Sequence, residues 1–181
     1  MIRKTGLMTL MGFLAAMLLP GAVCASDHAY RVEAGEVTVA WTLEEDQIHM
    51  ELSAETEGWV SIGIDPEDAM GGADIIIGAV KNDKFRVEDH YADRKRGHSP
   101  DEKLGGENHV INPEGKETDG VTTISFTRSV AAAEQWDKPI NTSGKTRVMV
   151  AHGSRDSLGL SHQYRAVYDI DFSTGEMVKV K

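Results

Sequence analysis

Two alternating runs joined by an acidic turn decide the fold. The first run is Val37-Thr38-Val39-Ala40-Trp41-Thr42-Leu43, the turn is Glu44-Glu45-Asp46, and the second run is Gln47-Ile48-His49-Met50-Glu51-Leu52. In both runs the large apolar side chains fall on every second position, which is typical of a strand with one buried and one solvated face. Because the turn is short, the two runs are predicted to form an antiparallel hairpin.

The same period of two recurs along the chain. Further strands are expected at residues 60–64, 75–80, 85–87, 121–127, 147–151 and 164–172. Residues 75–80 are continuously apolar, which indicates a strand buried on both faces. Residues 93–119 are polar and aperiodic, and we expect a long loop over one end of the sheets. Residues 129–135 are expected to form a short helix with Ser129 as its N-cap.

About eight to nine or more short strands with almost no helix predict an all-β fold. Turn signals separate these strands, and the chain shows no internal repeat and no sign of a second domain. The expected architecture is an immunoglobulin-like antiparallel β-sandwich.

The first 25 residues have the layout of a secretory signal peptide. Arg3 and Lys4 precede an apolar stretch at 7–19, and small residues near Ser26 offer a cleavage site. The alternatives are an uncleaved N-terminal anchor and a lipidated Cys24. We expect a signal peptide at 1–25 and a β-sandwich domain at 26–181, periplasmic or secreted, with no membrane span after cleavage.

Charge and cysteine content exclude several classes of function. The formal net charge is −10, and loss of Arg3 and Lys4 with the leader would make it −12. Such a surface repels phosphate backbones, so nucleic acid is not expected as a partner. Cys24 is the only cysteine, so the mature domain offers no disulfide, no iron–sulfur cluster and no covalent haem attachment.

Met70 and His162 are the candidate ligands for a metal cofactor. Met70 lies in a turn just before the apolar run at 75–80, and His162 lies just before the last strand. A thioether and an imidazole are the axial ligands of a low-spin electron-transfer haem. If they meet at one iron, the protein is a b-type cytochrome; if they do not, the sandwich has an end that is empty or filled differently.

Further residues are candidates for the cofactor site or for a separate metal site. Gly71 and Gly72 would let a large flat ligand approach the backbone closely. His152 is the fallback for His162, because it ends the preceding strand at the same end of the fold. Three further histidines, His90, His98 and His109, are expected to be solvated or to share a divalent metal. No catalytic constellation is found, so an enzyme is not expected.

Several motifs together resemble the DOMON domain family. They are Gly58-Trp59-Val60-Ser61-Ile62-Gly63-Ile64, Met70-Gly71-Gly72-Ala73-Asp74-Ile75-Ile76-Ile77-Gly78, Asp89-His90-Tyr91-Ala92, Val148-Met149-Val150-Ala151-His152-Gly153 and Ser161-His162. The resemblance covers nearly all of the mature chain. In its functional residues the chain is similar to the b-type cytochrome branch of the family, which includes the cytochrome domain of cellobiose dehydrogenase.

The resemblance implies a non-covalent haem b with Met70 and His162 as axial ligands. It implies a one-electron carrier that works with a redox partner protein, either membrane-bound or a dehydrogenase, and Arg165 or lysines near the pocket would pair with the propionates. The family also has members that bind no haem. Two alternatives therefore remain: a module that binds a carbohydrate or other small molecule through Trp59, Tyr91 and Tyr164, and a haem-binding subunit of a larger dehydrogenase complex.

Overall fold

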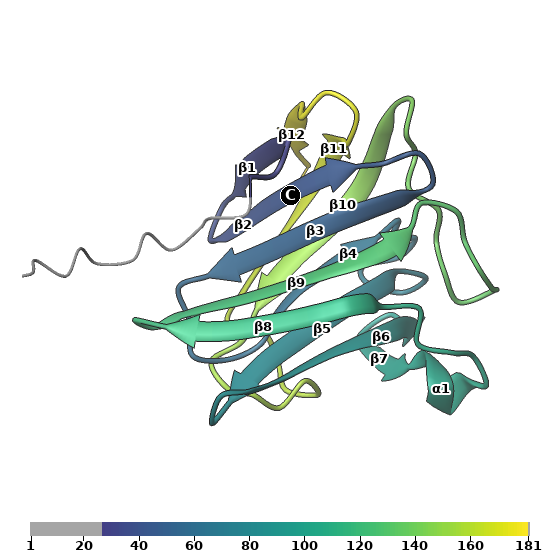
Figure 1. Ribbon diagram of the computed structural model, residues 1–181. Coiled ribbons are helices and arrows are strands. Elements are labelled where there is room, and N and C mark those ends of the chain that lie inside the picture. The colour runs from purple at the N-terminus through teal and green to yellow at the C-terminus, as the bar shows by residue number, and fades with distance from the viewer. Residues whose placement is uncertain (1–26, 181) are drawn as a thin grey trace, which may run out of the picture.

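The hairpin predicted from residues 37–52 lies at the centre of the first of two antiparallel sheets. The structure is a computed structural model that describes residues 27–180, and its two sheets pack face to face (Figure 1). The five-stranded sheet contains, in spatial order, β1 (Tyr30–Ala34), β2 (Val37–Leu43), β3 (Gln47–Ala54), β9 (Val121–Ser129) and β8 (Ile111–Thr118). The seven-stranded sheet contains β12 (Met177–Lys179), β11 (Tyr164–Asp171), β10 (Lys145–His152), β4 (Val60–Ile64), β5 (Asp74–Lys81), β6 (Lys84–Arg94) and β7 (Gly97–Pro100). The predicted all-β sandwich is confirmed.

Apolar side chains at every second position of the strands form the core between the sheets. In the hairpin, Val39 pairs with Leu52 and Trp41 with Met50, and all four side chains are fully buried. The Trp41 indole Nε1–H donates a hydrogen bond to the carbonyl oxygen of Phe172, 2.8 Å away, so this buried donor is satisfied. Burying a large apolar side chain contributes about 1.5–3 kcal/mol, and a core of this size stabilises the domain without a disulfide.

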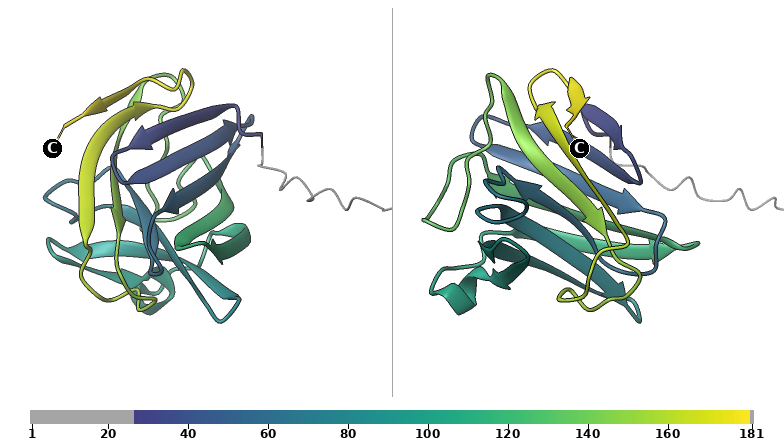
Figure 2. Two further views of the ribbon diagram at one scale, coloured as in Figure 1. Left: turned by 90° about the vertical axis from the view of Figure 1, so that its left-hand side faces the viewer. Right: turned by 180° about the vertical axis from the view of Figure 1, so that it is seen from behind.

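Strand β5 is buried on both faces, as its continuous apolar run predicted. Every residue from Asp74 to Val80 is buried. Ile76 belongs to the core between the sheets, whereas Ile75 and Ile77 belong to a second apolar cluster. Neighbouring side chains along a strand point to opposite faces, so the second cluster lies on the outer face of the seven-stranded sheet. The view from behind in Figure 2 looks onto this side of the molecule, with β10 and β11 in front.

The prediction of a long loop at residues 93–119 is wrong in part. This segment contains β7, the short helix α1 (Asp101–Leu104) and β8, which pairs with β9 at the edge of the five-stranded sheet. Most of β8 is exposed and few of its residues are apolar. Charged edge strands of this kind carry no alternating pattern, because only their backbone joins the sheet.

The prediction of a short helix at residues 129–135 is also wrong. Ser129 is the last residue of β9, and the residues after it form bends and turns. The reason is local competition for the backbone. Asp137 Oδ2 accepts hydrogen bonds from the amides of Ala133 and Glu134, both at 2.8 Å, and such side-chain acceptors favour turns over a helix.

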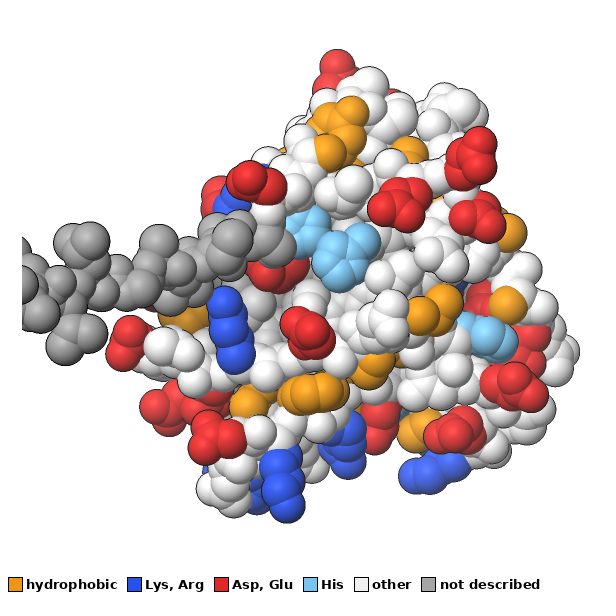
Figure 3. Space-filling view, in the orientation of Figure 1, with side chains coloured by type: hydrophobic (Ala, Val, Ile, Leu, Met, Phe, Trp, Pro, Cys, Tyr) orange, Lys and Arg blue, Asp and Glu red, His pale blue; other side chains and the backbone are white. Residues whose placement is uncertain are grey.

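The predicted signal peptide lies outside the described residues. Within residues 27–180, no helix is both long and apolar enough to cross a bilayer. Figure 3 shows the side of the five-stranded sheet, where acidic side chains are scattered among polar ones. This ordinary solvated surface contrasts with the outer face of the other sheet.

Candidate functional site

The outer face of the seven-stranded sheet carries a second apolar cluster, here called the outer cluster. Its buried members come from β5, β6 and three connections, and three partly buried side chains pack against them. The members are Trp59, Ala73, Ile75, Ile77, Ala79, Ala92, Leu158, Met70, Met149 and Ala151. A sandwich usually turns polar residues outward. An apolar outer face therefore indicates a surface that serves a ligand or a partner.

Small residues lie in the middle of this face. Gly63 on β4 pairs with Met149 on one side and Ile75 on the other, and Ser61 pairs with Ala151 and Ile77. A Cβ at Gly63 would lie 2.9 Å from the terminal methyl of Met149. The flexible thioether of Met149 thus lies over the glycine, and an unbranched side chain of this kind adapts readily to a new neighbour.

Met70 reaches the outer cluster from the turn between β4 and β5. The turn is tied by short backbone bonds: the Gly71 amide donates to the Asp68 carbonyl at 2.9 Å, and the Ala73 amide donates to the Met70 carbonyl at 3.1 Å. The Gly72 amide also donates to the Ala92 carbonyl of β6 at 2.9 Å. Met70 is consequently held in place by the backbone on both sides of it.

The two glycines after Met70 serve the turn itself. Gly72 has a φ of +82°, which L side chains rarely adopt, and a Cβ there would meet the Glu67 side chain at 2.8 Å. A Cβ at Gly71 would meet the backbone of Asp68 and Lys95 at 3.1 and 3.3 Å. The close approaches that these glycines permit are therefore to the protein's own chain.

His162 lies in the connection between β10 and β11. The same connection contributes Leu158, which is only 3% exposed, to the outer cluster. His162 itself is exposed. Its pKa is lowered by partial desolvation and by the nearby Arg165 charge. The neutral imidazole, which is the form that binds metals, is thereby favoured.

Met70 and His162 approach the sheet from opposite ends of its strands. The β4–β5 turn starts where Ile64 pairs with Asp74, whereas the β10–β11 connection starts where His152 pairs with both Val60 and Tyr164. The structure brings Met70 and Leu158 into one cluster and leaves His162 exposed four residues beyond Leu158. The two connections thus contribute to one face from its opposite ends, with the Met70 side chain in the outer cluster and His162 exposed.

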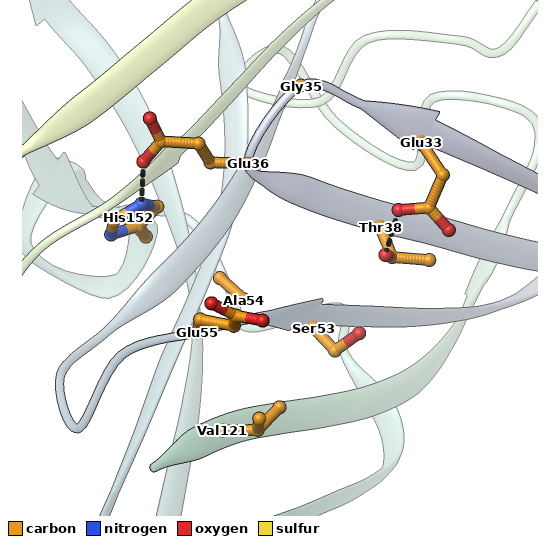
Figure 4. Close-up of a pocket in the computed structure, with 9 residues that line it drawn as sticks. All are labelled: Glu33, Gly35, Glu36, Thr38, Ser53, Ala54, Glu55, Val121 and His152. Atoms are coloured by element: carbon orange, nitrogen blue, oxygen red, sulfur yellow. Dashed lines mark hydrogen bonds and ion pairs between the residues drawn. The ribbon is translucent and has the colours of Figure 1, made fainter.

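His152, the fallback ligand, has other partners. Its Nε2 lies 3.0 Å from Glu36 Oε2, and its ring stacks on Tyr164 with centroids 5.7 Å apart. It continues the alternation of Val148 and Val150, which face the main core. Figure 4 shows it bordering a hollow of about 520 Å³ that Glu33, Glu36 and Glu55 also line. This hollow is acidic and unlike a dry haem pocket.

The structure places His90 and His98 together and His109 elsewhere, although all three were expected to be solvated or to share a metal. His90 of β6 is buried on the outer face beside Ile75, and its Nδ1 lies 2.8 Å from Nδ1 of His98. Burial lowers the pKa of His90, although Glu88 at 3.0 Å from its Nε2 opposes the shift. Burial and the His90 charge lower the pKa of His98 to about 4. His109 lies instead beside Asp89 and Asp137.

The aromatic residues considered for carbohydrate stacking occupy separate environments. Trp59 is 4% exposed in the outer cluster, where its indole nitrogen is buried without a hydrogen-bond partner. Tyr91 contacts Trp136, with ring centroids 5.2 Å apart. Tyr164 packs against the main core and His152. The three aromatic side chains therefore do not share one cluster.

Sequence reasoning missed several members of the outer cluster. Leu158 and Ala79 belong to none of the motifs, Met149 lies in a motif but is not a predicted site residue, and Trp59 is predicted to have another role. The signal that marks their place is the continuous apolar run of β5, because a strand buried on both faces needs cover on its outer side.

Comparisons with known proteins agree with this fold. The model of the family described as "DOMON domain" matches residues 33–153. The human protein DBH-like monooxygenase protein 1 is 28% identical over 123 residues, which are 68% of this chain and 19% of that protein. The chain thus spans about a fifth of that relative's length. The cytochrome b domain of pyranose dehydrogenase from Coprinopsis cinerea superposes with a TM-score of 0.57 at 15% identity, over 77% of this chain and 78% of that domain.

Proposed function

The chain belongs to the DOMON domain family, and from this premise we propose that it is an exported haem b-binding protein that carries single electrons, with Met70 and His162 as axial ligands. The observation that carries the proposal is the outer cluster. It is an apolar cluster on the outer face of the sandwich that includes Met70 and covers Gly63 with the flexible Met149 side chain. A flat apolar macrocycle needs surroundings of this polarity.

The donor set fits a low-spin haem. Met70 offers a thioether within the outer cluster, and His162 offers an imidazole whose lowered pKa favours the neutral form. When bound, a haem with these two ligands supplies reversible one-electron transfer and has no open coordination position. Ligation requires the His162 ring to turn inward from the border of the face. Its exposed position before β11 leaves it free to do so.

The residues around the ligands have separate tasks. The hydrogen-bonded turn holds Met70 in place, so little reorganisation is needed at the sulfur. Leu158 and Trp59 exclude water from the face. Arg165 pairs across the strands with Ala151, which places its cation beside the outer cluster for a propionate. The unpartnered Trp59 indole N–H is a second candidate donor for such a group.

The acidic surface fits a role as a carrier between proteins. A net charge of −10 over the full chain favours docking onto a basic redox partner and speeds the encounter at low ionic strength. The partner is proposed to be a dehydrogenase or a membrane-bound redox protein. We assign the chain no catalytic step of its own.

Haem binding is tested by titrating the purified, haem-free protein with ferric haem. The expected result is saturation at one haem per chain with a six-coordinate low-spin spectrum in both oxidation states. His49→Gln is the matched control, because His49 lies on the five-stranded sheet and is bonded to Thr127. A protein that stays colourless, or that binds haem only in a high-spin form, would overturn the proposal.

A further inference from the structure

A group of buried acidic side chains lies away from the outer cluster. Asp74, Asp89 and Asp101 are at most 3% exposed, and Asp137 is 6% exposed. They come from β5, β6, the start of α1 and the connection between β9 and β10. Arg128 bonds Asp74 through its Nη1, so one of the four carboxylates already has a cation. The other three are left with a surplus of negative charge in a buried place.

Three side chains of this group have the geometry of a metal site. Asp89, His109 and Asp137 each offer one ligand atom, and these atoms all lie within 4.8 Å of one another. His109 Nδ1 is 3.4 Å from Asp137 Oδ2. Ligand bonds of about 2.0–2.4 Å place neighbouring ligands about 3–4.8 Å apart around a divalent ion. The existing spacing therefore suits an ion between them.

The ligand atoms are held by the backbone. The amide of His109 donates to Asp89 Oδ2 at 3.1 Å, which fixes the imidazole-bearing residue next to that carboxylate. The amides of Ala133 and Glu134 hold Asp137 Oδ2, each at 2.8 Å. These bonds set the positions of the side chains before any ion is bound, as preorganised metal sites require.

Asp101 gives an independent indication of a missing cation. It is 0% exposed, and both of its carboxylate oxygens are buried without a hydrogen-bond partner. Its charge interacts unfavourably with those of Asp89 and Asp137, so it faces the same group. Asp89 Oδ1 is buried without a hydrogen-bond partner as well, and His109 Nδ1 has no hydrogen bond although Asp137 Oδ2 lies 3.4 Å away. Unpaired buried carboxylates cost several kcal/mol, and native proteins rarely leave them so.

We propose that Asp89, His109 and Asp137 bind one divalent metal ion, whose charge the buried, unpaired Asp101 carboxylate helps to balance. One imidazole with two carboxylates favours a transition ion such as Mn²⁺ or Zn²⁺ over Ca²⁺, which takes oxygen ligands. Without an ion, burial and the charges of Asp74 and Asp101 raise the pKa of Asp89 to about 8. The proton on the Asp89 carboxyl group would be released when the ion binds.

The ion has a structural task at the Met70 turn. It joins β6, α1 and the segment before β8 to the β9–β10 connection. The next residue of that connection, Lys138, donates its amide to Asp74 Oδ2 at 2.9 Å and its ammonium to Glu67 Oε1 at 2.7 Å. Glu67 belongs to the turn that carries Met70. Metal binding thus fastens the segment that supports this turn, and it does not depend on haem.

The site is tested with the full chain after treatment with a chelator. Equilibrium dialysis against Mn²⁺, followed by metal analysis, should give one ion per chain. Mn²⁺ or Zn²⁺ at a hundred times its dissociation constant should raise the melting temperature by about 5–10 °C. Failure to retain stoichiometric metal would overturn the proposal. A response to Ca²⁺ alone would overturn the assignment of His109.

Variants separate binding from packing. Asp101→Asn removes one unpaired charge, so the metal-free variant should melt at a higher temperature than the wild type and should lose most of the metal-induced rise. Glu102→Gln is the matched control, because Glu102 is the exposed neighbour of Asp101, and it should respond as the wild type does. Equal metal binding by both variants would contradict the proposal. Haem titration of the same samples tests the proposed function separately.

Discussion

Met70 and Leu158 pack into one apolar cluster although their connections leave the seven-stranded sheet at opposite ends. The β4–β5 turn and the β10–β11 connection therefore converge on the outer face of the sheet. His162 follows Leu158 in the second connection. This convergence is the structural reason for assigning a thioether and an imidazole so far apart in sequence to one site.

Leu158 anchors its connection to the sheet, and truncating it should weaken the site. Leu158→Ala is expected to lower the free energy of unfolding by about 2 kcal/mol, at the low end for a buried leucine, because the cavity lies near the surface. It should also weaken haem retention, since the segment before His162 loses its anchor. Leu160→Ala, in the same connection but 43% exposed, is the control. Equal haem loss rates for both variants would contradict this role.

The choice between His162 and His152 has a direct spectroscopic outcome. His162→Gln should convert the low-spin spectrum to a high-spin one, because the iron loses one axial ligand. His152→Gln should keep the low-spin spectrum even if it melts earlier, since His152 is engaged by Glu36 at 3.0 Å. Should His152→Gln turn the spectrum high-spin and His162→Gln leave it unchanged, the assignment must be reversed.

The buried ion pair beside β5 should dominate the stability of that region. Arg128→Met leaves Asp74, which is 0% exposed, without its cation. Removing one partner of a buried pair typically costs about 3–5 kcal/mol, and denaturant unfolding should show a loss of this size. Arg147→Met removes the exposed pair with Asp169 and should leave the free energy of unfolding near the wild-type value. Similar losses in the two variants would argue against a buried role for Arg128.

Between neutral and acidic pH, His90 and His98 should contribute a loss of stability, which opposes the gain from protonation of Asp89, whose pKa is raised to about 8. The pKa values of both are lowered, and that of His98 is about 4 against an ordinary value of 6.5. The unfolded chain takes up protons as the pH falls below 6.5, while the folded His98 resists them until about pH 4. The contribution of His98 is thus complete above pH 6.5 and is lost toward pH 4, and that of His90 changes in the same direction.

The expected size of this loss at His98 is about 2 kcal/mol, after allowance for its partial exposure. Relative to the wild type, His98→Asn should gain free energy of unfolding as the pH falls over this range, as measured by urea titration at several pH values. A difference between variant and wild type that does not change with pH would contradict the lowered pKa.

Local pattern predicted much of the fold, and its failures have physical causes. The hairpin and β5 followed from alternation and from a continuous apolar run, because their side chains pack into apolar layers. Strand β8 was missed because it adds backbone hydrogen bonds at an edge and little apolar area. The helix at 129–135 failed because Asp137, outside the window, binds the amides that a helix would use.

Only the part of the candidate site that lies within one continuous segment could be predicted from the sequence. The turn with Met70 has its own sequence signature, whereas the outer cluster joins side chains from strands and three connections that only the sheet register brings together. The same holds for Asp89, His109 and Asp137, which come from three separate segments. His90 and His98 looked solvated because their pairing depends on β7 folding back along β6.

The most direct test of the central claim is the ferric and reduced absorption spectrum of Met70→Ala reconstituted with haem, beside Met149→Leu as the matched control. Met149 is the other methionine of the outer cluster. The account predicts that Met70→Ala loses the methionine–iron charge-transfer band and becomes high-spin, while Met149→Leu retains the wild-type spectrum. A Met70→Ala protein with the unchanged low-spin spectrum would contradict the assignment of Met70 to the iron.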